Sequence, residues 1–190
     1  MSKKAMSDPQ ARLALMKRTK DLARYIEMAC QRGVDHAIVV ETSRVVTAPW
    51  VRMKCQFGCG GYGESLCCPP RTPTPDEMRK ILDSYTHGIL LHRQIKKGSK
   101  VIARLSKTAV DLEQALFLDG YYKAWTLGTG PCGLCKSCNV EACLHPDKAR
   151  PSMEACGIDV FATARAYKLP IQVVKGPADE RNFYALVLVE

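Results

Sequence analysis

The amino-acid sequence predicts a single α/β or α+β domain in which a mixed β-sheet packs against helices and carries two cysteine-rich loops. Strand-like and helix-like segments alternate along the chain, as in proteins that layer helices on a sheet. The 190 residues, 46% of them hydrophobic, are sufficient for one buried core. Eight of the ten cysteines fall in two long connections, and long connections in a compact domain are usually functional.

The chain begins with a predicted amphipathic helix, which we treat as an N-terminal element over residues 1–35. Asp8 is the expected N-cap, Pro9 takes the first helical position and Gly33 ends the helix. Cys30 adjoins the apolar face and is predicted to be a small buried thiol. That face consists of Leu15, Leu22, Ile26 and Ala29, which recur at helical spacing.

The main domain is predicted to span residues 36–190. Its first strand, HAIVVET, is rich in β-branched residues. The following segment, RVVTAPWVRMKC at 44–55, reads as extended and leads into the first cysteines. Thr74 and Glu77 form a capping box around Pro75, which predicts a helix of about ten residues after them.

Strands and helices continue to alternate in the second half of the chain. HGILLHRQI is a strand by its apolar run, and the helix after it ends at Gly120. Ser152 is placed to cap a helical turn. The predicted elements are a strand at 36–42, a strand at 87–95, a helix at 101–120, a strand at 121–130, a helix at 159–169 and strands at 171–175 and 183–190.

The cysteines indicate metal binding in a reducing compartment. No stretch approaches the roughly 18 continuous apolar residues of a membrane span, and the N-terminus lacks the apolar core of a secretory signal. A cytoplasmic location is therefore expected, where thiols stay reduced and disulfides are rare. Cysteines grouped at short spacings are then typical of metal ligands rather than of a disulfide framework.

The second cysteine loop, residues 131–146, has the spacing C-x2-C-x2-C-x4-C. Three cysteines at successive steps of three let a turning backbone direct three sulfurs at one cubic cluster, as in the ferredoxin run C-x2-C-x2-C-x3-C-P. Structural zinc sites usually take two ligand pairs a dozen or more residues apart, so a [4Fe-4S] cluster is favoured and zinc is the alternative. His145 could replace the last cysteine as a ligand. The predicted ligands are Cys132, Cys135, Cys138 and Cys143.

The first cysteine loop, residues 55–70, contains Gly58-x-Gly60-x-x-Gly63, the spacing of a dinucleotide-binding loop. That function requires a helix directly after the glycines, and the two prolines that follow Cys68 prevent one. Gly-Lys-Ser/Thr, which a P-loop needs, does not occur here. A radical-SAM enzyme needs C-x3-C-x2-C, but Tyr62 occupies the third cysteine position. These three enzyme classes are therefore disfavoured.

The cysteines of the first loop predict a second metal site. Adjacent cysteines seldom both reach one metal, so one of Cys67 and Cys68 is expected to be a ligand and the other a packing thiol. Cys68 is favoured because Pro69 fixes the chain beside it. Either Cys143 supplies a fourth ligand, as one cysteine of a ferredoxin run serves the other cluster, or one iron stays open as a Lewis acid. The local ligands are then Cys55, Cys59 and Cys68.

Three segments, KCQFGCGGYGESLCCPP, GPCGLCKSC and HPDKARPSMEACGID, together resemble an uncharacterised family of predicted metal-binding proteins found mainly in anaerobic bacteria and archaea. The resemblance extends from about residue 36 to the C-terminus. It supports Cys68 over Cys67 as the ligand, since the family's Cys-Pro-Pro match falls on Cys68, and it implies no reaction. The metal-binding positions that it implies are Cys55, Cys59, Cys68, Cys132, Cys135, Cys138 and Cys143.

We therefore expect a cytosolic protein with one or two [4Fe-4S] clusters that exchanges electrons with a redox partner protein. One alternative is an enzyme whose cluster has three cysteine ligands and an open iron that binds a substrate or sulfur atom. The other is a zinc-binding structural or adaptor protein. The formal charge of +9 falls to roughly +5 with two clusters of about −2 each, so nucleic acid is not an expected partner. No catalytic residues are predicted.

Overall fold

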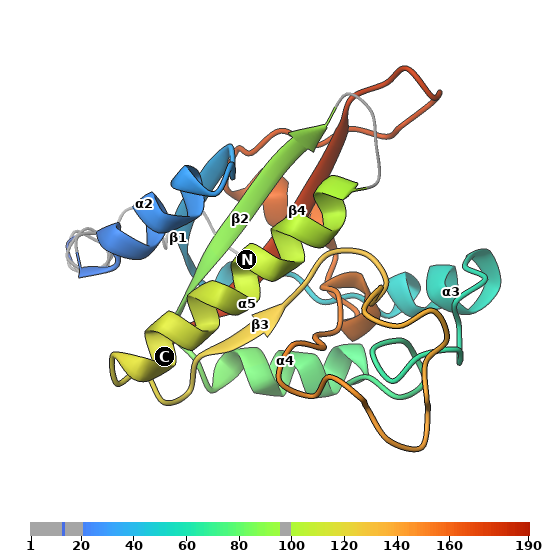
Figure 1. Ribbon diagram of the computed structural model, residues 1–190. Coiled ribbons are helices and arrows are strands. Elements are labelled where there is room, and N and C mark those ends of the chain that lie inside the picture. The colour runs from blue at the N-terminus through green and yellow to red at the C-terminus, as the bar shows by residue number, and fades with distance from the viewer. Residues whose placement is uncertain (1–12, 14–20, 96–99) are drawn as a thin grey trace.

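Figure 1 shows the computed structural model of the protein, which describes residues 13, 21–95 and 100–190. Its centre is a four-stranded sheet in the order β1-β2-β4-β3, and the pairings between these strands are antiparallel. Within the described residues, the parallel direction expected of a mixed sheet occurs as an isolated bridge between Gly128 and Ser152. The strands are β1 His36–Glu41, β2 His87–Ile95, β3 Trp125–Leu127 and β4 Arg181–Leu188.

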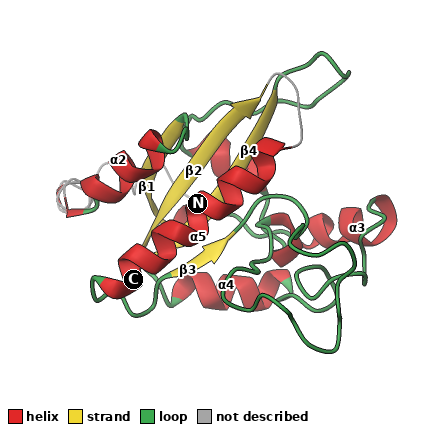
Figure 2. Ribbon diagram, in the orientation of Figure 1, coloured by secondary structure: helices red, strands yellow, loops and turns green. Residues whose placement is uncertain are grey.

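Helices cover both faces of the sheet (Figure 2). Successive strand residues point to opposite faces, and accordingly Ile89 and Leu91 pack with α2 and α5, whereas Leu90 packs with α4 and α6. The predicted α/β class, one domain with a sheet and packed helices, is thereby confirmed. The helices of the two layers are α2 Ala23–Gln31, α5 Lys100–Leu118, α4 Pro75–Asp83 and α6 Val160–Ala166.

The N-terminal helix packs into the same core as the rest of the domain. Leu22 and Ala29 are fully buried in the layer that contains α5, as the helical spacing predicts. Cys30 is exposed, so the prediction of a buried thiol is wrong: the side chain lies one position past the inner face. The predictions for Asp8, Pro9 and Leu15 concern residues outside the described part of the chain.

Two local predictions fail for identifiable reasons. The segment predicted to be extended at 44–55 overlaps the helix α3, Pro49–Gly58, which begins with proline at its first position. Its inner side chain Val51 is buried, and α3 contacts the short 3-10 helix η3, Glu154–Cys156. The segment 171–175 forms no strand, and its residues 172–175 are exposed. In both segments the β-branched residues favour an extended strand. Neither segment becomes one, because no neighbouring strand pairs with it.

Other local signals are confirmed. Thr74 and Glu77 form the predicted capping box at the start of α4, and the Ser152 hydroxyl accepts the backbone N–H of Ala155 at 3.1 Å at the start of η3. The predicted strand at 121–130 is shortened to the three residues of β3. None of the helices in the described part of the chain has the length and apolar character that a membrane crossing requires.

A buried histidine in the sheet makes the fold sensitive to acid. His92 on β2 is fully buried, with Nδ1 2.9 Å from Nδ1 of His36 and Nε2 2.8 Å from Oδ1 of Asn182. Burial lowers the pKa of His92 below its ordinary value, against the hydrogen bond to Asn182, which raises it. The unfolded chain therefore binds this proton more readily than the folded protein does. The stability that comes from burying neutral His92 is therefore complete above about pH 6.5. It is lost as the pH falls below that value.

We expect His92→Gln, which cannot titrate, to lose less stability than the wild type when the pH is lowered from about 7.5 to about 5.5. Urea unfolding at both pH values measures the difference, and NMR titration of the imidazole in the wild type should give a pKa below 6.5. Equal acid sensitivity of the two proteins would contradict this assignment.

Candidate metal centre

The two cysteine loops, distant in sequence, lie side by side beyond the edge strand β3 and next to α3 and α4 (Figure 1). The first loop connects α3 to α4, and the second connects β3 to η3. Residues of both loops line one cavity of about 260 Å³. The fold therefore brings the two sequence motifs into a common site.

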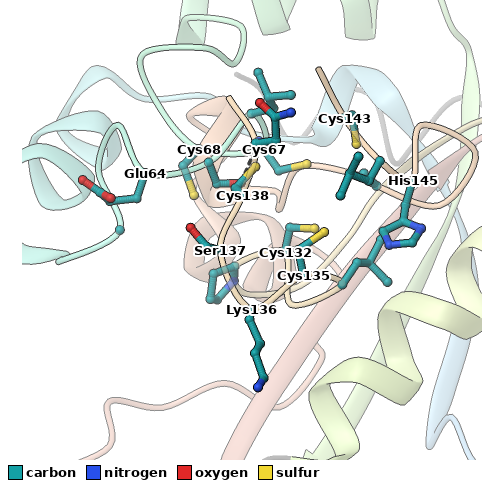
Figure 3. Close-up of a pocket in the computed structure, with 18 residues that line it drawn as sticks. Glu64, Cys67, Cys68, Cys132, Cys135, Lys136, Ser137, Cys138, Cys143 and His145 are labelled. Carbon is teal, nitrogen blue, oxygen red and sulfur yellow. Dashed lines mark hydrogen bonds between the residues drawn. The ribbon is translucent and has the colours of Figure 1, made fainter. Parts of the chain in front are cut away.

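Six cysteine side chains line this cavity, and Figure 3 draws Cys68 and Cys143 on opposite sides of it, with the sulfurs of Cys132 and Cys135 close together in the view. Within the described part of the chain, no three His, Cys, Asp or Glu side chains are grouped closely enough to hold a single metal ion. In this arrangement the described sulfurs do not converge on the position that a single ion would occupy. The six are Cys67, Cys68, Cys132, Cys135, Cys138 and Cys143.

The remaining two predicted ligands, Cys55 and Cys59, do not line the cavity and lie on the Cys68 side of it. Cys55 belongs to α3, and Cys59 is the residue that follows this helix. Burial and then the neighbouring Cys59 thiol raise the pKa of Cys55, and the same two causes in the same order raise the pKa of Cys68. Cys59 is therefore near both of the other predicted ligands of its loop.

Cys67 was predicted to be a packing thiol, and it is indeed buried, but it also faces the second loop. Burial is the first cause that raises the pKa of Cys67 to about 12, followed by the charge and the hydrogen-bonding contact of Cys132 and then by Cys143. Cys156 has a different environment. It is fully buried in the apolar layer of α4 and α6, and burial raises its pKa to about 12 as well.

Arg52 anchors the first cysteine loop to the domain. Its Nη1 donates to Thr72 Oγ1 at 2.9 Å, to the Pro73 carbonyl at 3.1 Å and to the Ala155 carbonyl at 3.1 Å. Thr72 Oγ1 in turn donates to the Ala155 carbonyl at 2.5 Å. Because Arg52 lies on α3 one turn before Cys55, these bonds fix the helix, the end of the loop and η3 relative to one another.

The two adjacent cysteines sit in a tight turn of this loop. The backbone N–H of Cys67 donates to Ser65 Oγ at 3.1 Å, and that of Cys68 donates to the Ser65 carbonyl at 3.1 Å. Gly63 N–H closes the turn by donating to the Pro69 carbonyl at 2.8 Å, and the Pro69–Pro70 peptide bond is cis. The turn holds two consecutive side chains in place without a helix or a strand.

A buried ion pair anchors the end of the second cysteine loop. Arg150 Nη2 lies 2.6 Å from Glu113 Oε1 on α5, and the two side chains are only 9% and 11% exposed. Arg150 also donates to the Pro146 carbonyl at 3.1 Å and stacks over Trp125, while Glu113 accepts the backbone N–H of Thr126 at 2.8 Å. The sequence gives no sign of this pair, because no local pattern relates positions 113 and 150.

The donor atoms fit a thiolate-binding metal or cluster. Thiolates select zinc, Cu(I) and iron–sulfur clusters, whereas magnesium and calcium require oxygen donors. Glu64 and Lys136 also line the cavity, but Figure 3 shows the carboxylate and the ammonium group pointing away from the sulfurs. The donor set at the cavity therefore consists of the cysteine sulfurs and the imidazole of His145, which the sequence offered as a replacement for Cys143 and which also lines the cavity.

Comparison with known proteins agrees with this chemistry. The family model described as "Predicted metal-binding protein (DUF2284)" matches residues 38–189, which include both cysteine loops. Neither a curated protein nor a solved structure matches the chain. Since the match covers most of the sequence, the chain belongs to the DUF2284 family of predicted metal-binding proteins.

Proposed function

We propose that this protein is a cytoplasmic electron-transfer protein that holds one or two [4Fe-4S] clusters between its two cysteine loops. The observation that carries the proposal is that six cysteines from the two loops line one cavity and, in the described part of the chain, do not group around a single metal position. The residues that would hold the metal are the seven cysteines of the sequence motifs, five of which line the cavity. When bound, the cluster would accept one electron from a reduced partner protein and pass it to an oxidised one.

The arrangement of the sulfurs favours a cluster over a single zinc ion. A structural zinc ion draws four donors to about 2.0–2.3 Å from one centre, so its ligands converge on a point. A cubic cluster binds each thiolate at a different iron, and the thiolates are therefore distributed around a volume. The two successive C-x2-C steps of the second loop add to this, because zinc sites usually separate their ligand pairs.

Electron transfer is favoured by the surroundings of the sulfurs. Five of the six cavity cysteines are only half-buried, so a cluster held there would lie near the surface that a partner protein approaches. The side chains of Glu64 and Lys136 point away from the sulfurs (Figure 3), which leaves neither of them placed to exchange a proton with a bound substrate. An electron carrier needs no such group.

The cysteines of the first loop support a second candidate, an enzyme with an open iron. Cys55, Cys59 and Cys68 are neighbours, and this loop supplies no fourth thiol to them other than Cys67, which faces Cys132. A cluster on these three thiols alone would expose one iron as a Lewis acid or a sulfur-binding position. Cyanide binds an open iron, so it distinguishes this candidate from an electron carrier.

Anaerobic purification followed by iron and acid-labile sulfide assays tests the proposed function. We expect equal iron and sulfide, about four or eight of each per chain, and an EPR signal after reduction that cyanide does not alter. A signal that changes with cyanide would favour the enzyme with an open iron. Colourless protein that contains stoichiometric zinc and no sulfide would contradict both and leave the structural zinc role.

A further inference from the structure

The outer face of the helix α3 is apolar, although it is exposed. Trp50, Met53 and Phe57 recur at helical spacing, and their exposed fractions are 43%, 60% and 78%. Val51 is the buried side chain of the helix, and Arg52 bonds the helix to η3. An amphipathic helix of a globular protein normally directs its large apolar side chains into the core. α3 directs three of them outward, which is typical of a surface that another molecule covers.

The same face carries a positive charge. Lys54 is exposed one helical turn after Trp50, and its Nζ lies 5.0 Å from the centre of the Trp50 ring. The helix contains Arg52 and Lys54 but no acidic residue. In the described part of the chain, Lys54 forms no ion pair with an Asp or Glu. A surface that complements this face is therefore negatively charged.

The outer face of α3 adjoins the candidate metal centre. Cys55 follows Lys54 on the same helix, and Cys59 is the first residue after the helix. Figure 1 shows α3 at the right-hand end of the molecule, next to the first cysteine loop. An α-helix with its side chains is about 10–12 Å across. A protein seated on the outer face would therefore lie within about that distance of Cys55, which is a predicted metal ligand.

We propose that the outer face of α3, formed by Trp50, Met53, Lys54 and Phe57, is the docking surface for an acidic electron-carrier protein. This inference rests on the proposed function and adds the surface and the charge of the redox partner. The three apolar side chains would form the desolvated centre of the contact, since aromatic residues and Met are enriched in protein interfaces. Lys54 would pair with a carboxylate of the partner and so select against basic proteins.

A second copy of the chain fits this face less well than an acidic protein does. In a two-fold interface the same surface patch of both subunits meets, so two Lys54 side chains would be brought together. α3 has no acidic residue to place between them. Each chain also has a formal charge of +9, and like charges oppose association. The charge of the face therefore favours a negatively charged partner over another copy.

Substitutions of Met53 by residues of opposite charge test the docking surface. The probe is a plant-type [2Fe-2S] ferredoxin of negative net charge, and biolayer interferometry measures its Kd for the anaerobically purified protein. We expect Met53→Glu to raise Kd about tenfold or more, and Met53→Lys, which removes the same apolar side chain, to raise it less. Phe117→Glu is the matched control and should leave Kd unchanged, because Phe117 is 58% exposed at the C-terminal end of α5, far from α3 (Figure 1).

The rate of electron transfer provides a second measurement. One electron passes from the reduced ferredoxin to the [4Fe-4S]2+ cluster, which becomes [4Fe-4S]+. Stopped-flow absorbance should rank the variants in the same order as their Kd values, with Met53→Glu the slower of the two Met53 variants. The iron content of each variant should equal that of the wild type, which separates docking from assembly of the cluster.

Several outcomes would overturn the proposal. Equal Kd values for the two Met53 variants would exclude the acidic partner, and an unchanged Kd in Met53→Glu would exclude the docking surface. A wild-type dimer that Trp50→Ala dissociates would assign the face to a second copy, and binding to phosphatidylglycerol vesicles that Trp50→Ala abolishes would assign it to a membrane. An iron-loaded wild type that does not bind the ferredoxin would overturn this inference while the proposed function stands. A wild type with no iron or sulfide would overturn the proposed function itself.

Discussion

Arg150→Ala is expected to lower the free energy of unfolding by about 3–5 kcal/mol, because it leaves the Glu113 carboxylate buried without a counter-charge. The pair is 2.6 Å apart, with the two side chains 9% and 11% exposed. The substitution also removes the hydrogen bond to the Pro146 carbonyl, which fixes the end of the second cysteine loop. Urea unfolding followed by circular dichroism measures the change.

Two variants separate the buried charge from a general effect of losing a cation. Lys107→Ala breaks an ion pair with Asp111 in which the lysine side chain is 74% exposed, and it should cost less than about 1 kcal/mol. Glu113→Gln/Arg150→Met removes both charges and should recover most of the lost stability, because no uncompensated charge remains buried. If Arg150→Ala costs no more than Lys107→Ala, the pair does not anchor the loop energetically.

The parts of the fold that could be predicted are those whose local pattern agrees with their packing. β2 is covered on both faces, so its apolar run Ile89, Leu90 and Leu91 identifies it. The start of α4 follows from the capping box of Thr74 and Glu77, which needs no tertiary contact. Such signals can be recognised in the sequence because the residues that produce them are only a few positions apart.

The helix α3 could not be predicted because its stability is tertiary. Val51 is the buried residue of the helix, so no apolar stripe with helical spacing marks it. The helix is held by η3 and by the bonds of Arg52 to Pro73 and Ala155. These partners lie about 20 and about 100 positions further along the chain, and a local pattern cannot show them.

The candidate site, like the fold, has features that the sequence predicts and features that it does not. The spacing of Cys132, Cys135 and Cys138 suggested a shared site, and the structure does bring them to one cavity. Spacing does not show the direction in which a side chain points, so it predicts Cys67 as a packing thiol, and the structure adds that this buried thiol also faces Cys132. A turn sets this direction, and the partner comes from the other loop. The choice between adjacent cysteines therefore requires three-dimensional information.

Removal of the metal is expected to open the second cysteine loop while the sheet remains folded. Residues 131–144 make no backbone–backbone hydrogen bond to any described residue, so ligation is the interaction that would hold this segment. The two apolar layers of the sheet contain no predicted ligand and should not depend on the metal. Circular dichroism should therefore change little after iron is removed with a chelator under reducing conditions.

Cleavage by trypsin at a defined peptide bond measures the opening of the second cysteine loop. Lys136 is exposed and lies between Cys135 and Cys138, two residues that ligation would fix. Cleavage there should accelerate about tenfold or more without metal, since each 1.4 kcal/mol of lost local stability raises the open population tenfold. Lys80, exposed on α4 behind the capping box, is the matched site and should stay resistant in both forms. Equal acceleration at Lys80 would show instead that the metal stabilises the whole domain, and no acceleration at Lys136 would show that the loop holds its shape alone.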